Sequence, residues 1–119
     1  MANPNIVNVT SIYGKTAVSD LGTSSVDLVT NAVDSGKVIK INSLTVANVD
    51  GISSANVSVN IFRSSTSYKL AHTIIVPADS SLVVISKDTS IYLEEGDTLQ
   101  AEASADSILQ AVCSYEEIS

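Results

Sequence analysis

The chain has 119 residues, which is the length of one domain, and we expect a single domain over residues 1–119. Its formal net charge of −7 disfavours nucleic-acid phosphates and anionic membrane surfaces as partners, because both would repel it. Hydrophobic residues make up 45% of the chain but aromatic residues only 4%, so most apolar residues are aliphatic, and this composition favours half-buried strands over helices.

Apolar and polar side chains alternate along most of the chain, which predicts a succession of strands. In the first half, we expect a strand over 5–13, a glycine-containing loop over 15–23 and a strand over 25–31. A turn at Asp34–Gly36 then leads into the longest predicted strand, over 37–48.

The predicted strand over 37–48 changes phase midway. Ile39 and Ile41 share one face, but Leu44 and Val46 fall on the opposite parity. A strand cannot exchange its buried face without a bulge, a bend or a passage to a second sheet. The sequence therefore predicts an irregularity near Asn42 and Ser43.

Short strands at regular spacing are expected through the second half. They cover 57–62, 68–76, 82–85, 91–93, 98–104 and 107–118, with turns at 77–79, 87–88, 95–97 and 105–106. The apolar run 82–85 is typical of a central strand covered on both faces. In 98–104 we expect Leu99, Ala101 and Ala103 to point inward. The whole pattern predicts an all-β fold, an antiparallel, jelly-roll-like β-sandwich of about eight strands.

Three acidic residues, Glu94, Glu95 and Asp97, surround Gly96 between two predicted strands. Glycine tolerates positive φ, so the pattern predicts a β-turn whose charged side chains lie in water. A metal site and a pair of carboxylates for acid–base chemistry are the alternatives. Against them, the loop pattern of a calcium site is absent, and neighbouring turn residues diverge instead of flanking a substrate.

The other chemically active residues are few. Cys113, the only cysteine, lies in a predicted strand and is expected to be a buried, inert thiol. His72, the only histidine, shares parity with Leu70 and Ile74 and is expected to be partly buried. One cysteine and one histidine cannot complete a structural zinc site.

The remaining patterns also favour a noncatalytic protein. The four tyrosines are candidates for a sugar-binding platform, although packing at strand ends is the expected role; they are Tyr13, Tyr68, Tyr92 and Tyr115. A nucleophile elbow, a P-loop and a dinucleotide-binding motif are all absent. We therefore predict no enzyme activity and no catalytic, cofactor-binding or metal-binding residues. The N-terminal MANPNIVNV has neither a basic region nor a long apolar run, so we expect synthesis in a cytoplasm without a signal peptide.

The second half of the chain carries a resemblance to a known group. The segment VPADSSLVVISKDTSIYLEEGDTLQAEASADSILQAVCSYEEIS, residues 76–119, resembles a recurring ending of small β-sandwich virion proteins of tailed phages, especially phages of cyanobacteria. The shared features are the proline-broken strand, the apolar run, the YLEEGD turn and the terminal SYEE. The upstream KINSLTVANVDG, residues 40–51, fits the same pattern, and the likeness covers roughly half the chain.

This resemblance implies a noncatalytic structural protein of a phage virion, synthesised in the host cytoplasm. It would be a capsid decoration, neck or tail-associated subunit, a homo-oligomer that binds other virion proteins. A mean hydropathy of +0.29 is compatible with apolar surface buried between copies. The alternative is a module at the virion surface that binds a host receptor or glycan, with the loops 49–56 and 64–67 as its recognition site.

Overall fold

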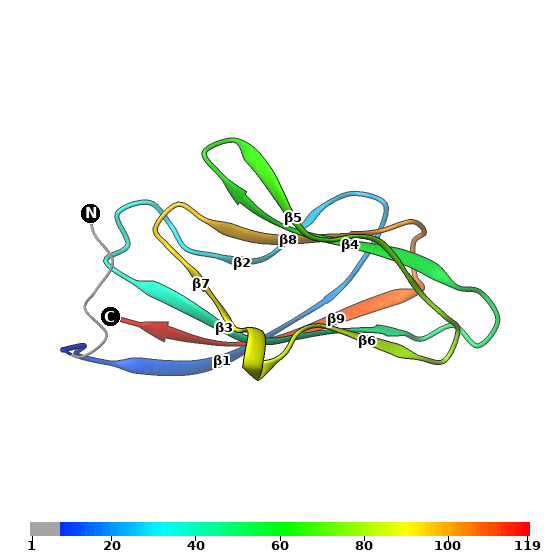
Figure 1. Ribbon diagram of the computed structural model, residues 1–119, viewed down its shortest axis with the longest axis horizontal. Helices are drawn as coiled ribbons and strands as arrows, with labels where there is room; N and C mark the ends of the chain where they lie inside the picture. The colour runs from blue at the N-terminus through cyan, green and yellow to red at the C-terminus, as the bar shows by residue number, and fades with distance from the viewer. Residues whose placement is uncertain (1–7) are drawn as a thin grey trace.

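The computed structural model describes residues 8–119, which form nine strands and one short 3-10 helix (Figure 1). The strands are β1 (Ile12–Asp20), β2 (Val26–Thr30), β3 (Val38–Asn48), β4 (Ala55–Arg63), β5 (Thr66–Val76), β6 (Ser81–Ile85), β7 (Ile91–Leu93), β8 (Thr98–Ala103) and β9 (Leu109–Ile118). The helix, η1, spans Lys87–Thr89. Almost all of the regular structure is therefore extended, as the composition predicts.

The strands form two antiparallel sheets that pack face to face (Figure 1). The first sheet has the order β1-β9-β3-β6, with β7 also paired to β3, and the second has the order β2-β8-β4-β5. β1 pairs with β9, β2 with β8, β3 with β6 and β4 with β5. The chain is thus one long hairpin rolled into two layers, which is the arrangement of a jelly roll, and the predicted fold class is confirmed.

The core lies between the sheets and is built from alternate residues of each strand. In β8, Leu99, Ala101 and Ala103 are buried while the residues between them are partly exposed, as predicted. Ala111 and Cys113 of β9 are also buried. Burial of such aliphatic side chains stabilises the fold by about 25 cal/mol per Å² of apolar surface removed from water.

β3 contains the predicted irregularity. Its pairing with β9 runs from residue to residue up to Ile41↔Tyr115 and resumes at Ser43↔Ser114, so Asn42 is an extra residue. This bulge moves Leu44 onto the inner face, where its side chain is fully buried. The bulge therefore explains the change of phase in the sequence.

The structure corrects the first part of the predicted strand pattern. Residues 8–11 are not strand and β1 begins at Ile12, so the strand expected over 5–13 is wrong there; residues 5–7 lie outside the described residues. The loop expected over 15–23 is also wrong, because most of it belongs to β1. A Cβ at Gly14 would meet nothing within 4 Å, and nine pairs with β9 outweigh the local turn propensity of the glycines.

The apolar run 82–85 is also not what the sequence predicts. It lies in β6, an edge strand that pairs only with β3, and Val83 is 58% exposed, so the prediction of a covered central strand is wrong. A register shift leaves Val84 as an extra residue of β6, and this shift places Ile85 opposite Leu44, where both side chains are buried. The turn expected at 87–88 is the beginning of η1.

The edge strands of the two sheets are built differently. β1 pairs with β9 through nine consecutive one-to-one pairs. β5 has two register shifts against β4, and Thr73 within it has a φ of +50°. β2 and β6 are short, and each contains a register shift. Bulges and short length hinder the addition of a further strand, so β1 is the long, regular edge among the described strands.

Candidate functional site

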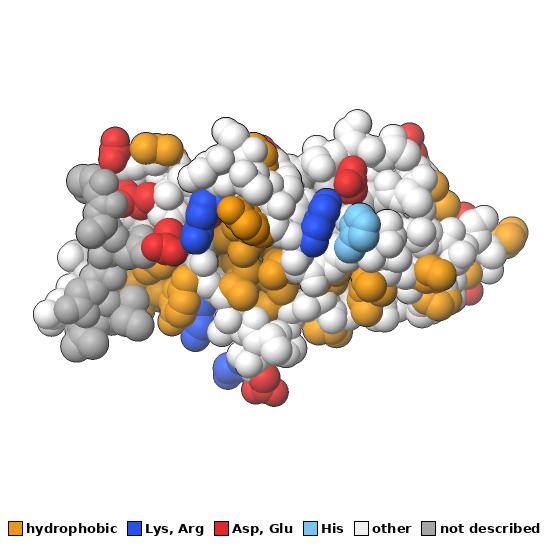
Figure 2. Space-filling model, turned by 45° about the horizontal axis from the view of Figure 1, so that its top comes forward, with side chains coloured by type: hydrophobic (Ala, Val, Ile, Leu, Met, Phe, Trp, Pro, Cys, Tyr) orange, Lys and Arg blue, Asp and Glu red, His pale blue; other side chains and the backbone are white. Residues whose placement is uncertain are grey.

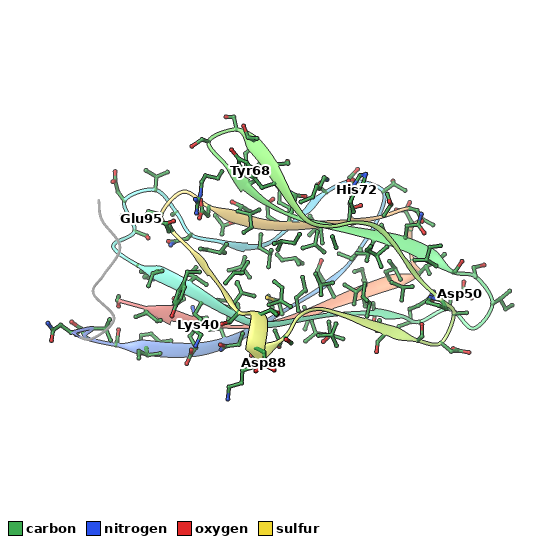
Figure 3. All side chains as sticks on the ribbon, viewed as in Figure 1. Lys40, Asp50, Tyr68, His72, Asp88 and Glu95 are labelled. Carbon is green, nitrogen blue, oxygen red and sulfur yellow. The ribbon has the colours of Figure 1, made fainter. Side chains whose placement is uncertain are left out.

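The acidic residues Glu94, Glu95 and Asp97 lie in the turn between β7 and β8, as predicted. The backbone N–H of Asp97 donates to the Glu94 carbonyl at 3.0 Å and closes the turn. Gly96 has a φ of +89°, a conformation that costs glycine little. Figure 3 shows Glu95 at one end of the sandwich, so this turn belongs to the outer rim of the molecule.

Asp97 contradicts the expectation that these charged side chains lie in water, because it is only 1% exposed. It accepts hydrogen bonds from Arg63 Nε at 2.7 Å, from Arg63 Nη2 at 2.5 Å and from the Glu94 backbone N–H at 2.8 Å. The hydrogen bond to Asp97 raises the pKa of Arg63 above its ordinary value. β4 thus supplies a cation directly beside the turn, and a bidentate pair of this kind makes the burial of Asp97 tolerable.

Asn31, which the sequence did not single out, connects this turn to the rest of the same end. Its side chain is 1% exposed, and Nδ2 donates to the carbonyls of Lys37 and Leu93 at 2.9 Å each. The Asn31 carbonyl accepts the Gly96 N–H at 2.8 Å, and Ser35 Oγ donates to Asn31 Oδ1. An asparagine as the last residue of a predicted strand, shortly before a turn, was the available signal.

The acidic residues of the turn are all engaged with neighbouring groups. Glu94 accepts from Arg63 Nη2 at 3.0 Å, and Glu95 accepts the backbone N–H of Gly36 at 2.8 Å. Among residues 8–119, no three His, Cys, Asp or Glu side chains lie close enough together to hold a metal ion. The open hollow above the turn is also lined by Val33 and Ser64. This arrangement fixes the turns, and we assign it a structural role.

His72 lies in β5 and is exposed, so the prediction of a partly buried histidine is wrong. Figure 3 shows it on the outer side of the β4–β5 layer. The two register shifts in β5 break the alternation that His72 was expected to share with Leu70 and Ile74, which are themselves 42% and 41% exposed.

Cys113 is fully buried in the core, as predicted. Burial raises the pKa of its thiol to about 11, because the thiolate would be poorly solvated there. A thiol that stays protonated and inaccessible is inert as a nucleophile.

The tyrosines do not gather in one place. Tyr115 packs against the core, whereas Tyr13, Tyr68 and Tyr92 are between 44% and 60% exposed. Tyr68 belongs to the second sheet, and the strands of Tyr13 and Tyr92 are separated by β9 and β3. Three strand spacings correspond to about 14 Å, so these rings do not form a contiguous platform.

A row of exposed apolar side chains crosses the outer face of the first sheet. Val18 of β1 lies opposite Val112 of β9, Val112 opposite Thr45 of β3, and Thr45 opposite Val83 of β6. Val18 is 73%, Val83 58% and Val112 46% exposed. We call these four residues the valine row. The sequence did not reveal it, because the row exists only once the four strands are in register.

Two further rows border the valine row on the outer face. On one side the register aligns the small residues Thr16, Ser114 and Ser43 across β1, β9 and β3. On the other side it aligns Asp20, Gln110, Ala47 and Ser81, and Gln110 Nε2 donates to Asp20 Oδ1 at 2.9 Å. Short side chains leave a sheet face flat, and a flat face with exposed apolar groups is typical of a protein-interaction surface.

The loops expected to recognise a glycan lie at opposite ends of β4. The loop that begins at Val49 precedes β4, and the turn at Ser64 and Ser65 follows it. Nine strand residues between them correspond to roughly 25 Å or more, so the two loops do not form one recognition surface.

Exposed hydrophobic side chains also occur along the middle of the side of the molecule that Figure 2 presents. In the second sheet, β5 contributes Tyr68, Leu70, Ile74 and Ile75 to the exposed hydrophobic residues. The bulges of β5 divide these side chains, whereas the valine row is continuous across its sheet. The valine row is therefore the better candidate for a functional surface.

Comparisons with known proteins give a fold but no family. No protein-family model matches the chain, and no curated protein matches it. Among solved structures, the chain is similar to one from Bacillus endospore appendages, which are a family of disulfide-linked pili. The two share 13% identity with a TM-score of 0.51, over 92% of this chain and 88% of that one.

Phage capsid proteins are also among the structural neighbours. A chain from the acid-stable capsid of a Helicobacter pylori bacteriophage is 10% identical, with a TM-score of 0.51 over 94% of this chain and 90% of that one. A pentameric capsid protein from metagenomic phage sequences is 18% identical, with a TM-score of 0.42 over 87% of this chain and 62% of that one. At these identities the likeness shows the fold alone. In residues 8–119, no helix has the length and apolar character needed to cross a membrane.

Proposed function

We propose that this chain is a noncatalytic structural subunit of a phage particle, where it assembles in several copies with other virion proteins. Its place would be capsid decoration, the neck or the tail. The valine row carries this proposal, because a row of exposed apolar side chains across a sheet face is suited to burial against another subunit. The fold-level similarity to a phage capsid chain supports it, as does the use of jelly rolls in viral capsids.

The similarity to the spore appendage subunit suggests a different kind of assembly, a disulfide-linked fibre. Within these 119 residues the only cysteine is Cys113, and its side chain is fully buried in the sandwich. A disulfide to another copy would require the core to open. We therefore infer that copies of this chain associate without covalent links.

A catalytic role has little support from the described residues. The acidic residues at the Glu94–Asp97 turn are engaged in structural bonds, Cys113 is buried, and His72 lies on an outer face. Binding of a host glycan is supported less than assembly, because the two expected recognition loops are far apart.

The test is the position and copy number of the chain in purified phage particles, measured by cryo-microscopy and quantitative mass spectrometry. A copy number close to that of the major capsid subunit would support decoration, and a small ring-like number would support the neck or tail. Absence from purified particles, together with competition for host adsorption by the isolated domain, would overturn the structural role.

A matched pair of variants tests the valine row itself. Val112→Lys places a charge at the middle of the row, and burial of an unpaired charge is costly, so we expect incorporation to fall by at least about tenfold. Val112→Thr keeps the size and adds no charge, so it should incorporate nearly as well as the unchanged protein. Equal incorporation of both variants would exclude the row as the contact surface.

A further inference from the structure

β1 has one side whose backbone groups point away from the molecule. The N–H of Leu21 donates to the Leu109 carbonyl at 2.9 Å, and this pair continues the one-to-one register after Asp20↔Gln110. Successive residues of a strand direct their N–H and C=O groups to opposite sides. The odd-numbered residues of β1 therefore bond to β9, and the even-numbered residues from Ile12 to Asp20 direct their backbone groups away from the sheet.

Little in β1 opposes the addition of another strand. It is nine residues long, pairs with β9 without a bulge and ends the first sheet of the described residues. Its two charged residues are Lys15 and Asp20, which have opposite signs. Lys15 is engaged with Glu117 at 3.2 Å, and Asp20 accepts from Gln110 Nε2 at 2.9 Å. Two copies of β1 would thus meet without net charge.

We propose that β1 pairs antiparallel with β1 of a second copy of this chain, about a two-fold axis beside Thr16. This inference deepens the proposed function and rests on it for the assembly of several copies. It assigns the contact to the β1 edge, whereas the valine row on the outer face remains free for a different subunit.

Two conditions select the position of the axis. Residues that lie opposite each other in an antiparallel pair point to the same face, so the axis must lie at a residue and not between two residues. Even-numbered residues, whose backbone groups are free, then lie opposite even-numbered residues of the second copy, and the second condition is the largest number of pairs. Thr16 is the midpoint of β1, and an axis there pairs all nine residues, with Gly14 opposite Val18 of the second copy. A Thr–Thr pair across strands is itself favourable.

The paired copies would share one sheet of ten strands. Its order is β6-β3-β9-β1, followed by the same strands of the second copy in reverse, and β7 of each copy also pairs with β3. A two-fold axis perpendicular to the sheet keeps both outer faces on the same side. Both valine rows then face the same way, and a partner that contacts both gains from their linkage.

Disulfide cross-linking tests the register directly. Thr16→Cys places two thiols at a directly opposed pair, whose Cα atoms lie about 5.5 Å apart, within disulfide range. Gly14→Cys is the matched control, since the same axis separates its two copies by roughly 13 Å. A Cβ at Gly14 meets nothing within 4 Å, and the native thiol of Cys113 is buried. We expect Thr16→Cys to form covalent dimers at least about tenfold faster; equal rates would overturn the register.

Amide hydrogen exchange on the unchanged protein provides a test that needs no variant. The amides of Lys15, Ala17 and Ser19 should be protected at every protein concentration, because they bond to β9. Those of Thr16 and Val18 should exchange rapidly at low concentration and become protected as copies associate. If they stay unprotected in the oligomer, or are already protected in the monomer, β1 pairing is wrong.

These outcomes separate the inference from the proposed function. If the chain is found in purified particles while Thr16 and Val18 remain unprotected there, the structural role stands and the β1 contact fails. If the chain is absent from particles but its β1 amides become protected on association, the contact stands and the virion role fails.

Discussion

The two ends of the sandwich are closed in the same way and charged differently. At one end Asn31 is buried and donates to two backbone carbonyls. At the other end Asn48 is 4% exposed, and its Nδ2 donates to the carbonyls of Ser53 and Val76 at 2.9 Å each. Its Oδ1 accepts the N–H of Asp50 at 2.8 Å. A buried asparagine with three bonds therefore holds each end.

The charges of the two ends are unequal. The ion pairs of the described residues link Arg63 to Glu94 and Asp97, and Lys15 and Lys37 to Glu117, and all of these lie at or near the Asn31 end. The Asn48 end is held by neutral bonds and by Asp50, whose carboxylate accepts only local N–H groups (Figure 3). An asparagine side-chain amide thus stabilises both ends, and ion pairs add to it at one end only.

The largest difference between the ends should appear when their aspartates are removed. Asp97→Ala removes a buried carboxylate and leaves the Glu94 N–H without its acceptor, so we expect the free energy of unfolding to fall by about 3 kcal/mol. Asp50→Ala, the matched variant at the other end, removes bonds of a partly exposed turn and should cost about 1 kcal/mol. Urea unfolding measures both, and equal losses would contradict the asymmetry.

Removing the two asparagines should have similar effects. Asn31→Ala and Asn48→Ala each leave one buried and one part-buried backbone carbonyl without its donor, so each should lower the free energy of unfolding by about 2 kcal/mol. The ends are far apart, so the double variant should show the sum of the two losses. A strongly non-additive result in thermal or urea unfolding would show that the ends are coupled.

Acidification should weaken the charged end. Burial alone would raise the pKa of Glu117, but the hydrogen bond from Lys15 and the charges of Lys37 and Lys15 together lower it. A carboxyl whose pKa is lower in the folded chain stabilises it above the unfolded value of about 4.3, and this contribution is lost as the pH falls through the folded pKa.

Glu117→Gln removes this dependence. Its free energy of unfolding should be lower than that of the unchanged protein at neutral pH by less than about 1 kcal/mol, and the two proteins should converge in acid. Urea titrations over a series of pH values measure the difference. If the difference in free energy of unfolding between the two proteins widened on acidification, the pKa of Glu117 would not be lowered in the folded chain.

The smallest effect is expected at the tip of the neutral end. Ile52 is 91% exposed, so Ile52→Ser should change the free energy of unfolding by less than about 0.5 kcal/mol. A larger loss by thermal unfolding would show that Ile52 packs against the chain in solution. Retained stability with reduced incorporation into particles would instead identify the tip as a contact.

The sequence predicted what depends on neighbouring residues. The bulge at Asn42 follows from a parity change within a few positions, and the glycine turn at Gly96 follows from one residue type. The burial of Asp97 depends on Arg63, which lies 34 positions earlier in the chain, and no local sequence pattern predicts that the two residues pair. β1 was missed for the same reason, because its partner residues lie near position 110 and beyond.

The valine row could not be predicted from the sequence for a related reason. Its residues are distributed from Val18 to Val112, and only the register of four strands aligns them. Exposed valines in separate segments are ordinary in a β-rich chain. Sequence therefore indicates the fold class, whereas the candidate surface depends on pairing that only the folded chain shows.

The position of β9 between β1 and β3 has a consequence for how the protein is made. Synthesis proceeds from the N-terminus, so both neighbours leave the ribosome before the strand that joins them. The first sheet cannot form until residues 109–118 have emerged. In an unfinished chain the valine row is not aligned and β1 has no β9 to pair with. Entry into any assembly through these surfaces is thereby restricted to chains whose translation has passed that point.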